Sequence, residues 1–225
     1  MAKEWMIPNI KIIRSKRKTI SLQITDNVTL IVRAPLGVNN EVLERIIAKH
    51  RKWIERKQYE VKTRKSVEHE FTDGENFLYL GNHHMLKIVD EQELPLIFDD
   101  GFFISKRYLS MARELFVNWY KIQSYKIIGQ RVEYYGQKFG FKYNRIKITG
   151  AQKRWGSCSS NGNLNFSWRL IMAPMAVIDY VVIHELVHLE ERNHGKHFWM
   201  KVEMLMPDHE TQEDWLKKYG YSLTL

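Results

Sequence analysis

The chain is best understood from one stretch, His184-Glu-Leu-Val-His188-Leu-Glu-Glu-Arg-Asn-His194-Gly-Lys-His197-Phe-Trp199. In a helix, residues four apart differ by about 400° in direction and about 6 Å in height, so His184 and His188 lie on one face. Both imidazoles can therefore bind one ion. Glu185 lies about 100° further round, where it can hold a metal-bound water without displacing it, as a general base must.

A third imidazole is available at His194 if the helix ends before it. In a continuous helix His194 would point about 240° away from His188, so we expect the helix to end between these two residues. Asn193 and Gly195 tolerate the left-handed conformation that closes many helices.

Three neutral imidazoles suit Zn²⁺ and leave its fourth position open for water, which is typical of a catalytic site. We therefore predict a zinc hydrolase in which His184, His188 and His194 bind the metal. The prediction leaves two alternatives for the third ligand, His197 and Glu203. A donor to the oxyanion is also needed, and the residue types suggest three candidates: Arg154, Tyr180 and His197.

Cysteine content and hydropathy restrict the compartment. Cys158 is the only cysteine, so no internal disulfide can form, and a reducing compartment is indicated. No apolar run approaches the ~18 residues of a membrane span, and the N-terminal residues lack the apolar core of a signal peptide. We expect a cytoplasmic protein with no membrane association. Cys158 suits packing inside a hairpin better than a role as a nucleophile.

The net charge of +9 is concentrated in the N-terminal third. Residues 1–70 hold 16 Lys/Arg and 8 Asp/Glu, a balance of +8, whereas residues 71–225 hold 19 and 18. Such a field attracts nucleic acid or phosphorylated substrates, although it can also serve solubility alone. The densest positive site is a predicted turn with Arg14, Lys16, Arg17 and Lys18, which is a candidate polyanion-binding site.

Hydrophobic patterning predicts an α+β fold. Period-two alternation predicts strands at 10–13, 20–24 and 28–32, joined by turns at 14–18 and 26–27, and further strands between 71 and 104. Helical spacing predicts one basic helix from Asn39-Asn40 to about Arg64, with Val42, Ile46, Trp53 and Ile54 facing inward. A second helical stretch covers about 106–139, where Gly129 suggests a break.

A small sheet is predicted just before the histidine helix. Residues 145–149 form a strand pattern, and Asn161-Gly162 is a strong hairpin signal within 154–170. An edge strand there could pair with an extended peptide, although an ordinary core hairpin fits the pattern equally well. After Pro207 another helix is expected, capped by Asp208.

These elements suggest two domains, a β-rich basic N-terminal domain with a helix at 1–105 and a catalytic domain at 106–225. No flexible linker is visible in the sequence. The boundary near 105 should therefore be closely packed.

Several motifs resemble the YgjP-like family of predicted zinc metallopeptidases. They are Arg14–Leu22, Val32–Pro35, Arg154–Cys158, Asn163–Leu170, His184–His188 and Asn193–His194. More distantly, the C-terminal half is similar to the SprT-like and Wss-type proteases that cut proteins crosslinked to DNA. The resemblance implies a zincin core with a small sheet and an active-site helix, zinc on the three histidines and Glu185 as the base. Glu191 stands where the metzincin pattern has glycine.

Two other functions remain open at this point. Some YgjP-like members carry the label UTP pyrophosphatase, although Mg²⁺-dependent phosphoryl chemistry favours clustered carboxylates over histidines. A nucleic-acid-binding module with a structural zinc would need a fourth ligand, and Cys158 is the only thiol. The expected partner is a peptide or protein substrate, with nucleic acid as a further candidate through the basic N-terminal part. The oligomeric state does not follow from the sequence.

Overall fold

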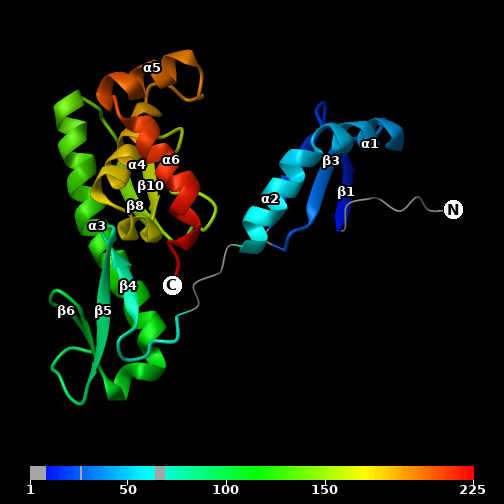
Figure 1. The fold of residues 1–225 in the computed structure, drawn as a ribbon. Coiled ribbons are helices and arrows are strands. Elements are labelled where there is room, and N and C mark those ends of the chain that lie inside the picture. Colours follow the sequence, from blue (N-terminus) through cyan, green and yellow to red (C-terminus); the bar gives the residue numbers. More distant parts are fainter. Residues whose placement is uncertain (1–8, 26, 64–68) are drawn as a thin grey trace. The chain divides into compact units, whose positions relative to one another are not determined.

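The computed structural model describes residues 9–25, 27–63 and 69–225, and the chain divides into two compact units, Met1–Lys65 and Ser66–Leu225 (Figure 1). We call them unit 1 and unit 2. The fold belongs to the α+β class, as the alternation of short strand patterns with helical patterns predicted. Among the described residues, no helix combines the length and apolarity needed to cross a lipid bilayer.

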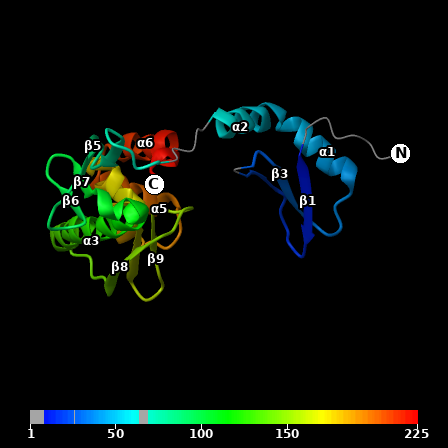
Figure 2. The same cartoon turned by 90° about the horizontal axis from the view of Figure 1, so that it is seen from below.

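Unit 1 is a three-stranded sheet covered on one face by two helices (Figure 1, Figure 2). Its strands are β1 (Ile10–Ser15), β2 (Ser21–Ile24) and β3 (Leu30–Pro35), in the order β1-β3-β2. β3 is central, parallel to β1 and antiparallel to β2. The three strands were predicted, but β1 pairs with β3 and not with its neighbour in sequence. Asp26, half of the second predicted turn, lies outside the described residues.

The predicted single basic helix is two helices, α1 (Asn40–Lys49) and α2 (Arg51–Thr63), which meet at His50. Asn39 caps α1 as expected, because its side chain accepts a hydrogen bond from the Val42 amide at 3.0 Å. Leu43 and Ile47 are buried against β3, whereas the predicted inward residues Val42 and Ile46 are half-buried. Arg64, the expected helix end, lies outside the described residues.

The basic turn of unit 1 is partly engaged in the fold. The Arg14 guanidinium donates to the Val38 carbonyl and, at 2.7 Å, to Asn40 Oδ1. Arg14 therefore ties β1 to the start of α1. Lys16 and Lys18 are exposed, whereas Arg17 is half-buried.

Unit 2 begins with a four-stranded sheet of order β4-β5-β7-β6, made of β4 (Asn76–Tyr79), β5 (Asn82–Val89), β6 (Leu96–Phe98) and β7 (Phe102–Ser105). A 3₁₀ turn, η1 (Lys106–Met111), leads into α3 (Ala112–Phe139). α3 is one unbroken helix, so the predicted break at Gly129 is wrong. Gly129 has open space around its Cβ position, and the hydrogen bonds of the helix continue through it.

The division between the two compact units falls between residues 65 and 66, whereas the sequence suggested a domain boundary near residue 105. Phe77 and Phe102 from the four-stranded sheet pack on Phe116 of α3, with ring centroids 4.3 and 4.7 Å away. The Tyr120 hydroxyl of α3 donates to the Leu78 carbonyl at 2.7 Å. The sheet therefore shares one continuous hydrophobic core with the rest of unit 2.

The second sheet of unit 2 contains β8 (Arg145–Thr149), β9 (Gly156–Cys158) and β10 (Asn163–Ser167), in the order β8-β10-β9. Gly162, at φ +69°, closes the predicted β9–β10 hairpin. A 3₁₀ turn, η2 (Trp168–Met172), then leads into α4 (Met175–Val187). β10 is the central strand, which leaves β9 at one edge of this sheet, beside α4.

The chain continues with α5 (Lys196–Leu205), α6 (His209–Tyr219) and the short η3 (Gly220–Ser222). α6 begins after Pro207 as predicted, and Asp208 occupies the cap position, where its side chain accepts from Gln212 and not from a helix amide. Arg131 of α3 makes a two-point contact with Asp179 of α4, at 2.5 Å from Nε and 2.8 Å from the terminal nitrogen. This pair fixes the angle at which α4 lies on α3.

Candidate metal centre and active site

The centre of the site is the C-terminal end of α4, a helix buried on almost every side. Val181, Val182 and Leu186 pack into the core of unit 2. His184 lies in the last turn and His188 at the C-cap, so both imidazoles emerge at the end of the helix. This is the common face that their four-residue spacing predicted.

His194 returns to the two helix histidines from the loop that follows. Its Nε2 lies 3.0 Å from Nε2 of His188 and 3.0 Å from Nε2 of His184. Among the described residues, these three form a group of side chains whose candidate ligand atoms all lie within 4.8 Å of one another. His197 and Glu203, the two alternative third ligands, are exposed and do not belong to this group.

α4 ends at Val187 with His188 as its C-cap, so the helix stops before His194 as expected. The amides of Glu190 and Glu191 donate to the Val187 carbonyl at 3.1 and 2.9 Å, which closes the last turn. Asn193 is not among the residues with positive φ, and Gly195 has an extended φ of −81° and caps α5. Neither residue adopts the left-handed conformation that its type tolerates.

The same turn orients the second imidazole. Nδ1 of His188 donates to the Glu191 carbonyl at 2.9 Å, which leaves Nε2 as the free ligand atom of that ring. Outer hydrogen bonds of this kind fix the tautomer and direction of a metal-binding histidine. Glu191 stands where the metzincin pattern has glycine. It acts here through its backbone carbonyl, which a residue of any type can supply.

Two aromatic residues of α5 support the three imidazoles. Phe198 is fully buried, with its ring centroid 4.9, 4.6 and 4.7 Å from those of His184, His188 and His194. Trp199 stacks on His194 at 5.8 Å and, on its other side, on His209 at 5.8 Å. Phe198 was not singled out from the sequence. The only signal was an aromatic pair at the start of a helix.

The surroundings favour the neutral form of the two helix imidazoles, His184 and His188. Burial, together with the neighbouring His188 and His194, lowers the pKa of His184 to about 3. The pKa of His188 is also lowered, mainly by burial. Nδ1 of His184 is buried without a hydrogen-bond partner. Neutral rings with free nitrogens are the form that binds a metal ion.

Glu185 is the buried carboxyl group of the site, with 5% of its surface exposed. Burial raises its pKa to about 8, and the charge of Arg154 opposes this shift. Its Oε2 has no hydrogen-bond partner. A carboxyl held in this way can take up and release a proton near neutral pH.

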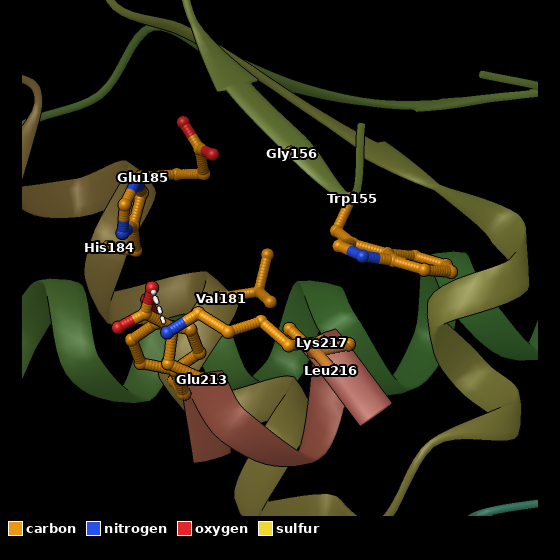
Figure 3. Close-up of a pocket in the computed structure, with 9 residues that line it drawn as sticks. Trp155, Gly156, Val181, His184, Glu185, Glu213, Leu216 and Lys217 are labelled. Atoms are coloured by element: carbon orange, nitrogen blue, oxygen red, sulfur yellow. Dashed lines mark ion pairs between the residues drawn. The ribbon is translucent and has the colours of Figure 1, made fainter. Parts of the chain in front are cut away.

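Gly156 of β9 faces this carboxyl group directly, as Figure 3 shows. A Cβ atom at Gly156 would lie 2.5 Å from Oε1 of Glu185 and 2.6 Å from its Cγ. Only glycine therefore lets the edge strand and the carboxylate lie so close together. The close approach of strand and helix was not visible in the sequence, although Gly156 was quoted in the Arg154–Cys158 motif.

β9 presents backbone groups to solvent along its free edge. The Ser159 amide donates to the Asn163 carbonyl, and the Ser167 amide donates to the Trp155 carbonyl. Because hydrogen-bonded positions alternate along an antiparallel pair, the amides and carbonyls of Gly156 and Cys158 point away from β10. In the described part of the chain, β10 is the one neighbour of β9 in the sheet.

Two joined cavities surround Glu185. The metal cleft, of about 390 Å³, is lined by residues 156–158 of β9, by the three histidines, and by Glu185 and Arg192. The tryptophan cavity, of about 330 Å³, is drawn in Figure 3 and has apolar walls with a Glu213–Lys217 ion pair at 2.9 Å. Its other lining residues are Trp155, Gly156, Tyr180, Val181, His184, Glu185 and Leu216.

The other residues considered for the site in the sequence analysis lie at different distances from the histidines. Tyr180 is buried, lines the tryptophan cavity and packs edge-on against His184 at 5.8 Å. Arg154 is exposed, but its charge acts on Glu185. Cys158 lines the metal cleft without belonging to the histidine group, and burial raises the pKa of its thiol.

The donor set fits zinc on geometric grounds. Zinc–nitrogen bonds of about 2.0–2.1 Å in tetrahedral geometry put ligand nitrogens about 3.3 Å apart, close to the observed 3.0 Å. Three neutral nitrogens without a thiolate or a second carboxylate are the set expected for a site with an open position.

Comparison with known proteins gives one family match. The family model described as "YgjP-like, metallopeptidase domain" matches residues 18–219, which is nearly the whole chain. A crystal structure of the metallopeptidase zymogen of Pyrococcus abyssi abylysin is similar to part of the chain, with a TM-score of 0.37 and 21% sequence identity. The similarity covers 40% of this chain and 93% of that one. No curated protein matches the chain.

Proposed function

The chain belongs to the YgjP-like metallopeptidase family, and from this premise we propose that it is a zinc-dependent peptidase whose active site is the end of α4. The observation that carries the proposal is the convergence of three Nε2 atoms beside a buried carboxyl group. His184, His188 and His194 would hold the ion. Bound zinc would supply Lewis acidity and lower the pKa of a water molecule to about 7.

Glu185 is the proton carrier in this proposal. Its carboxylate accepts a proton from the attacking water, and the resulting acid passes that proton to the amine that leaves when the peptide bond breaks. The products are a carboxylate and an amine, so the carboxyl group of Glu185 returns to its starting state. The unpartnered Oε2 and the close Gly156 backbone support this role, because Oε2 is not engaged by another described residue.

The substrate would bind as an extended peptide along the free edge of β9. The outward amides and carbonyls of Gly156 and Cys158 offer backbone hydrogen bonds that do not depend on the substrate sequence. Such pairing would hold the scissile bond against Glu185 in a defined register. Specificity would then come from the cavities beside the strand.

Tyr180 is the best-supported donor to the oxyanion. It lies one helical turn before His184 and lines the same cavity as Glu185. Burial raises the pKa of its hydroxyl, so the group stays protonated and can donate a hydrogen bond. Arg154 is the alternative within reach of the Glu185 charge, whereas His197 is exposed and outside the histidine group.

Metal analysis of three single variants tests the ligand assignment. We expect His194→Ala to lose zinc, and His197→Ala and Glu203→Ala to retain it, because the last two residues lie outside the histidine group. Full zinc content in His194→Ala would reject the assignment. A cobalt-substituted sample should show no thiolate bond, since a Cys158 ligand would favour a structural zinc.

Substrate assays test the reaction. We expect zinc-loaded protein to cleave casein-derived peptides and Glu185→Gln to be inactive. UTP is the matched second substrate. Hydrolysis of UTP alone, abolished by Glu185→Gln, would establish the nucleotide pyrophosphatase in place of the peptidase.

Nucleic-acid binding by unit 1 and a cytoplasmic location both stay predictions from the sequence. Excess positive charge in residues 1–70 supports the first. Binding that hardly weakens between low and high salt would contradict it.

A further inference from the structure

Three cavities follow one another along β9 and the turn after it. Trp155 and Gly156 line the tryptophan cavity, and residues 156–158 line the metal cleft. Residues 159–162 line a third cavity of about 330 Å³, which we call the arginine cavity. The metal cleft shares Gly156 and Glu185 with the first cavity and Arg192 with the third. The three cavities therefore adjoin one another beside the edge strand and its turn, and we call this series of cavities the track.

The arginine cavity differs in charge from the rest of the track. Lys142 and Arg192 line it, and none of its lining residues is a carboxylate. In the described part of the chain, neither cation has an acidic partner within ion-pair distance. The other side chains of the lining are mostly polar: Tyr143, Asn144, Ser159, Ser160 and Asn161. Two uncompensated cations in a polar cavity favour an anionic ligand.

Arg192 is positioned at the junction with the metal cleft. Its guanidinium donates to the Ser160 carbonyl at 3.0 Å, and among the described residues its other N–H groups make no further hydrogen bond. A guanidinium presents paired donors that match the two oxygens of a carboxylate. By contrast, the tryptophan cavity already contains a satisfied Glu213–Lys217 pair among apolar walls. Of the two end cavities, the arginine cavity is therefore the one that suits an acidic group of a ligand.

We propose that the arginine cavity binds a carboxylate of the peptide substrate, three or four residues from the scissile bond. The inference rests on the proposed peptidase function. The scissile bond would lie beside Gly156, because Gly156 lies against Glu185. Ser159 is three residues further along the chain, about 10 Å away at the rise of an extended strand, and Ser160 begins the turn that follows. An extended peptide paired with β9 reaches the cavity at that separation.

The carboxylate could come from an Asp or Glu side chain or from the C-terminus of a short peptide. Ten-residue peptides with both ends blocked, each with one glutamate at a different position, test the first source. The matched peptides carry glutamine there. A second set with a free C-terminus, of decreasing length, tests the other source. A preference in either set supports the inference and identifies the source.

We expect kcat/KM to be about tenfold higher for glutamate than for glutamine at one position, three or four residues from the cleaved bond, as one charge-assisted contact of about 1.4 kcal/mol gives. Lys142→Ala and Arg192→Gln should bring this ratio close to one. The matched control is Lys147→Ala, which removes an exposed lysine from β8 outside the cavity and should keep the full ratio. A ratio of one at every position in the wild-type chain, or a ratio unaffected by both variants, would overturn the inference.

Equilibrium binding separates this inference from the proposed function. Fluorescently labelled glutamate and glutamine peptides are titrated with Glu185→Gln protein, which has no catalytic carboxylate. Tighter binding of the glutamate peptide, lost on adding Arg192→Gln, would support the cavity even if no peptide is cleaved. Cleavage with equal binding of both peptides would leave the peptidase in place and reject the cavity as a carboxylate site.

Discussion

Replacing Gly156 by alanine should disable Glu185 while leaving the metal ligands in place. The new Cβ would lie 2.5 Å from Oε1, 2.6 Å from Cγ and 2.8 Å from Cδ of Glu185. Ordinary carbon contacts begin at about 3.5 Å, so the carboxyl group must move by roughly 1 Å. Gly156 does not have positive φ, so alanine introduces no backbone strain, and the clash alone causes the effect.

A displacement of about 1 Å in a catalytic group costs on the order of 100-fold in rate, or about 2.7 kcal/mol of transition-state stabilisation. We therefore expect kcat/KM for peptide hydrolysis to fall about 100-fold in Gly156→Ala. Overpacking should also cost about 1–3 kcal/mol of folding free energy. Zinc content should stay at the wild-type level, because the histidine group does not include β9.

Gly129→Ala is the matched control. Nothing lies within 4 Å of its Cβ position in the middle of α3, so alanine should stabilise the helix by about 0.5–1 kcal/mol and leave activity unchanged. The assays are peptide hydrolysis, zinc content by mass spectrometry and thermal unfolding. Wild-type activity of fully zinc-loaded Gly156→Ala would refute the assignment of Glu185 as the proton carrier held against β9.

Three further outcomes are expected. Phe198→Ala removes the wall behind the imidazoles, so it should cost about 3–5 kcal/mol of stability and weaken zinc binding; an unchanged zinc dissociation constant in a titration would contradict the supporting role. Asp179→Asn leaves the half-buried Arg131 without its charged partner and should cost about 1–3 kcal/mol in urea unfolding, and no loss would show that the pair does not fix α4. Chelation should lower the unfolding temperature, since an ion at a hundred times its dissociation constant adds about 2.7 kcal/mol; His188→Ala, with one ligand missing, should respond much less to the chelator.

The relative positions of residues within one helix could be predicted accurately from the sequence. The shared face of His184 and His188, and the helix end before His194, follow from helical geometry, which is the same in every protein. The β9–β10 hairpin was likewise predictable, because Gly162 supplies the positive φ that the turn requires. Local spacing was sufficient wherever the interacting residues are close in the chain.

The sequence was a poorer guide to where helices break and to which elements pack together. Gly129 lies within an unbroken helix, whereas His50, which carries no breaking signal, separates α1 from α2. One glycine in a helix costs only about 1 kcal/mol relative to alanine, which a helix as long as α3 can absorb. The four-stranded sheet joins unit 2 because its phenylalanines pack on α3, a choice of partner that alternation within a strand does not encode.

The sequence by itself determined the α+β class, the helix with two histidines on one face, and the ligand types suited to zinc. Only the tertiary structure decided that Gly156 lies against Glu185, that Phe198 supports the three imidazoles, and that β9 is an edge strand beside three cavities. The physical reason is separation along the chain. Backbone geometry fixes the relation of residues a few positions apart, whereas contacts between distant segments depend on how whole helices and sheets pack together.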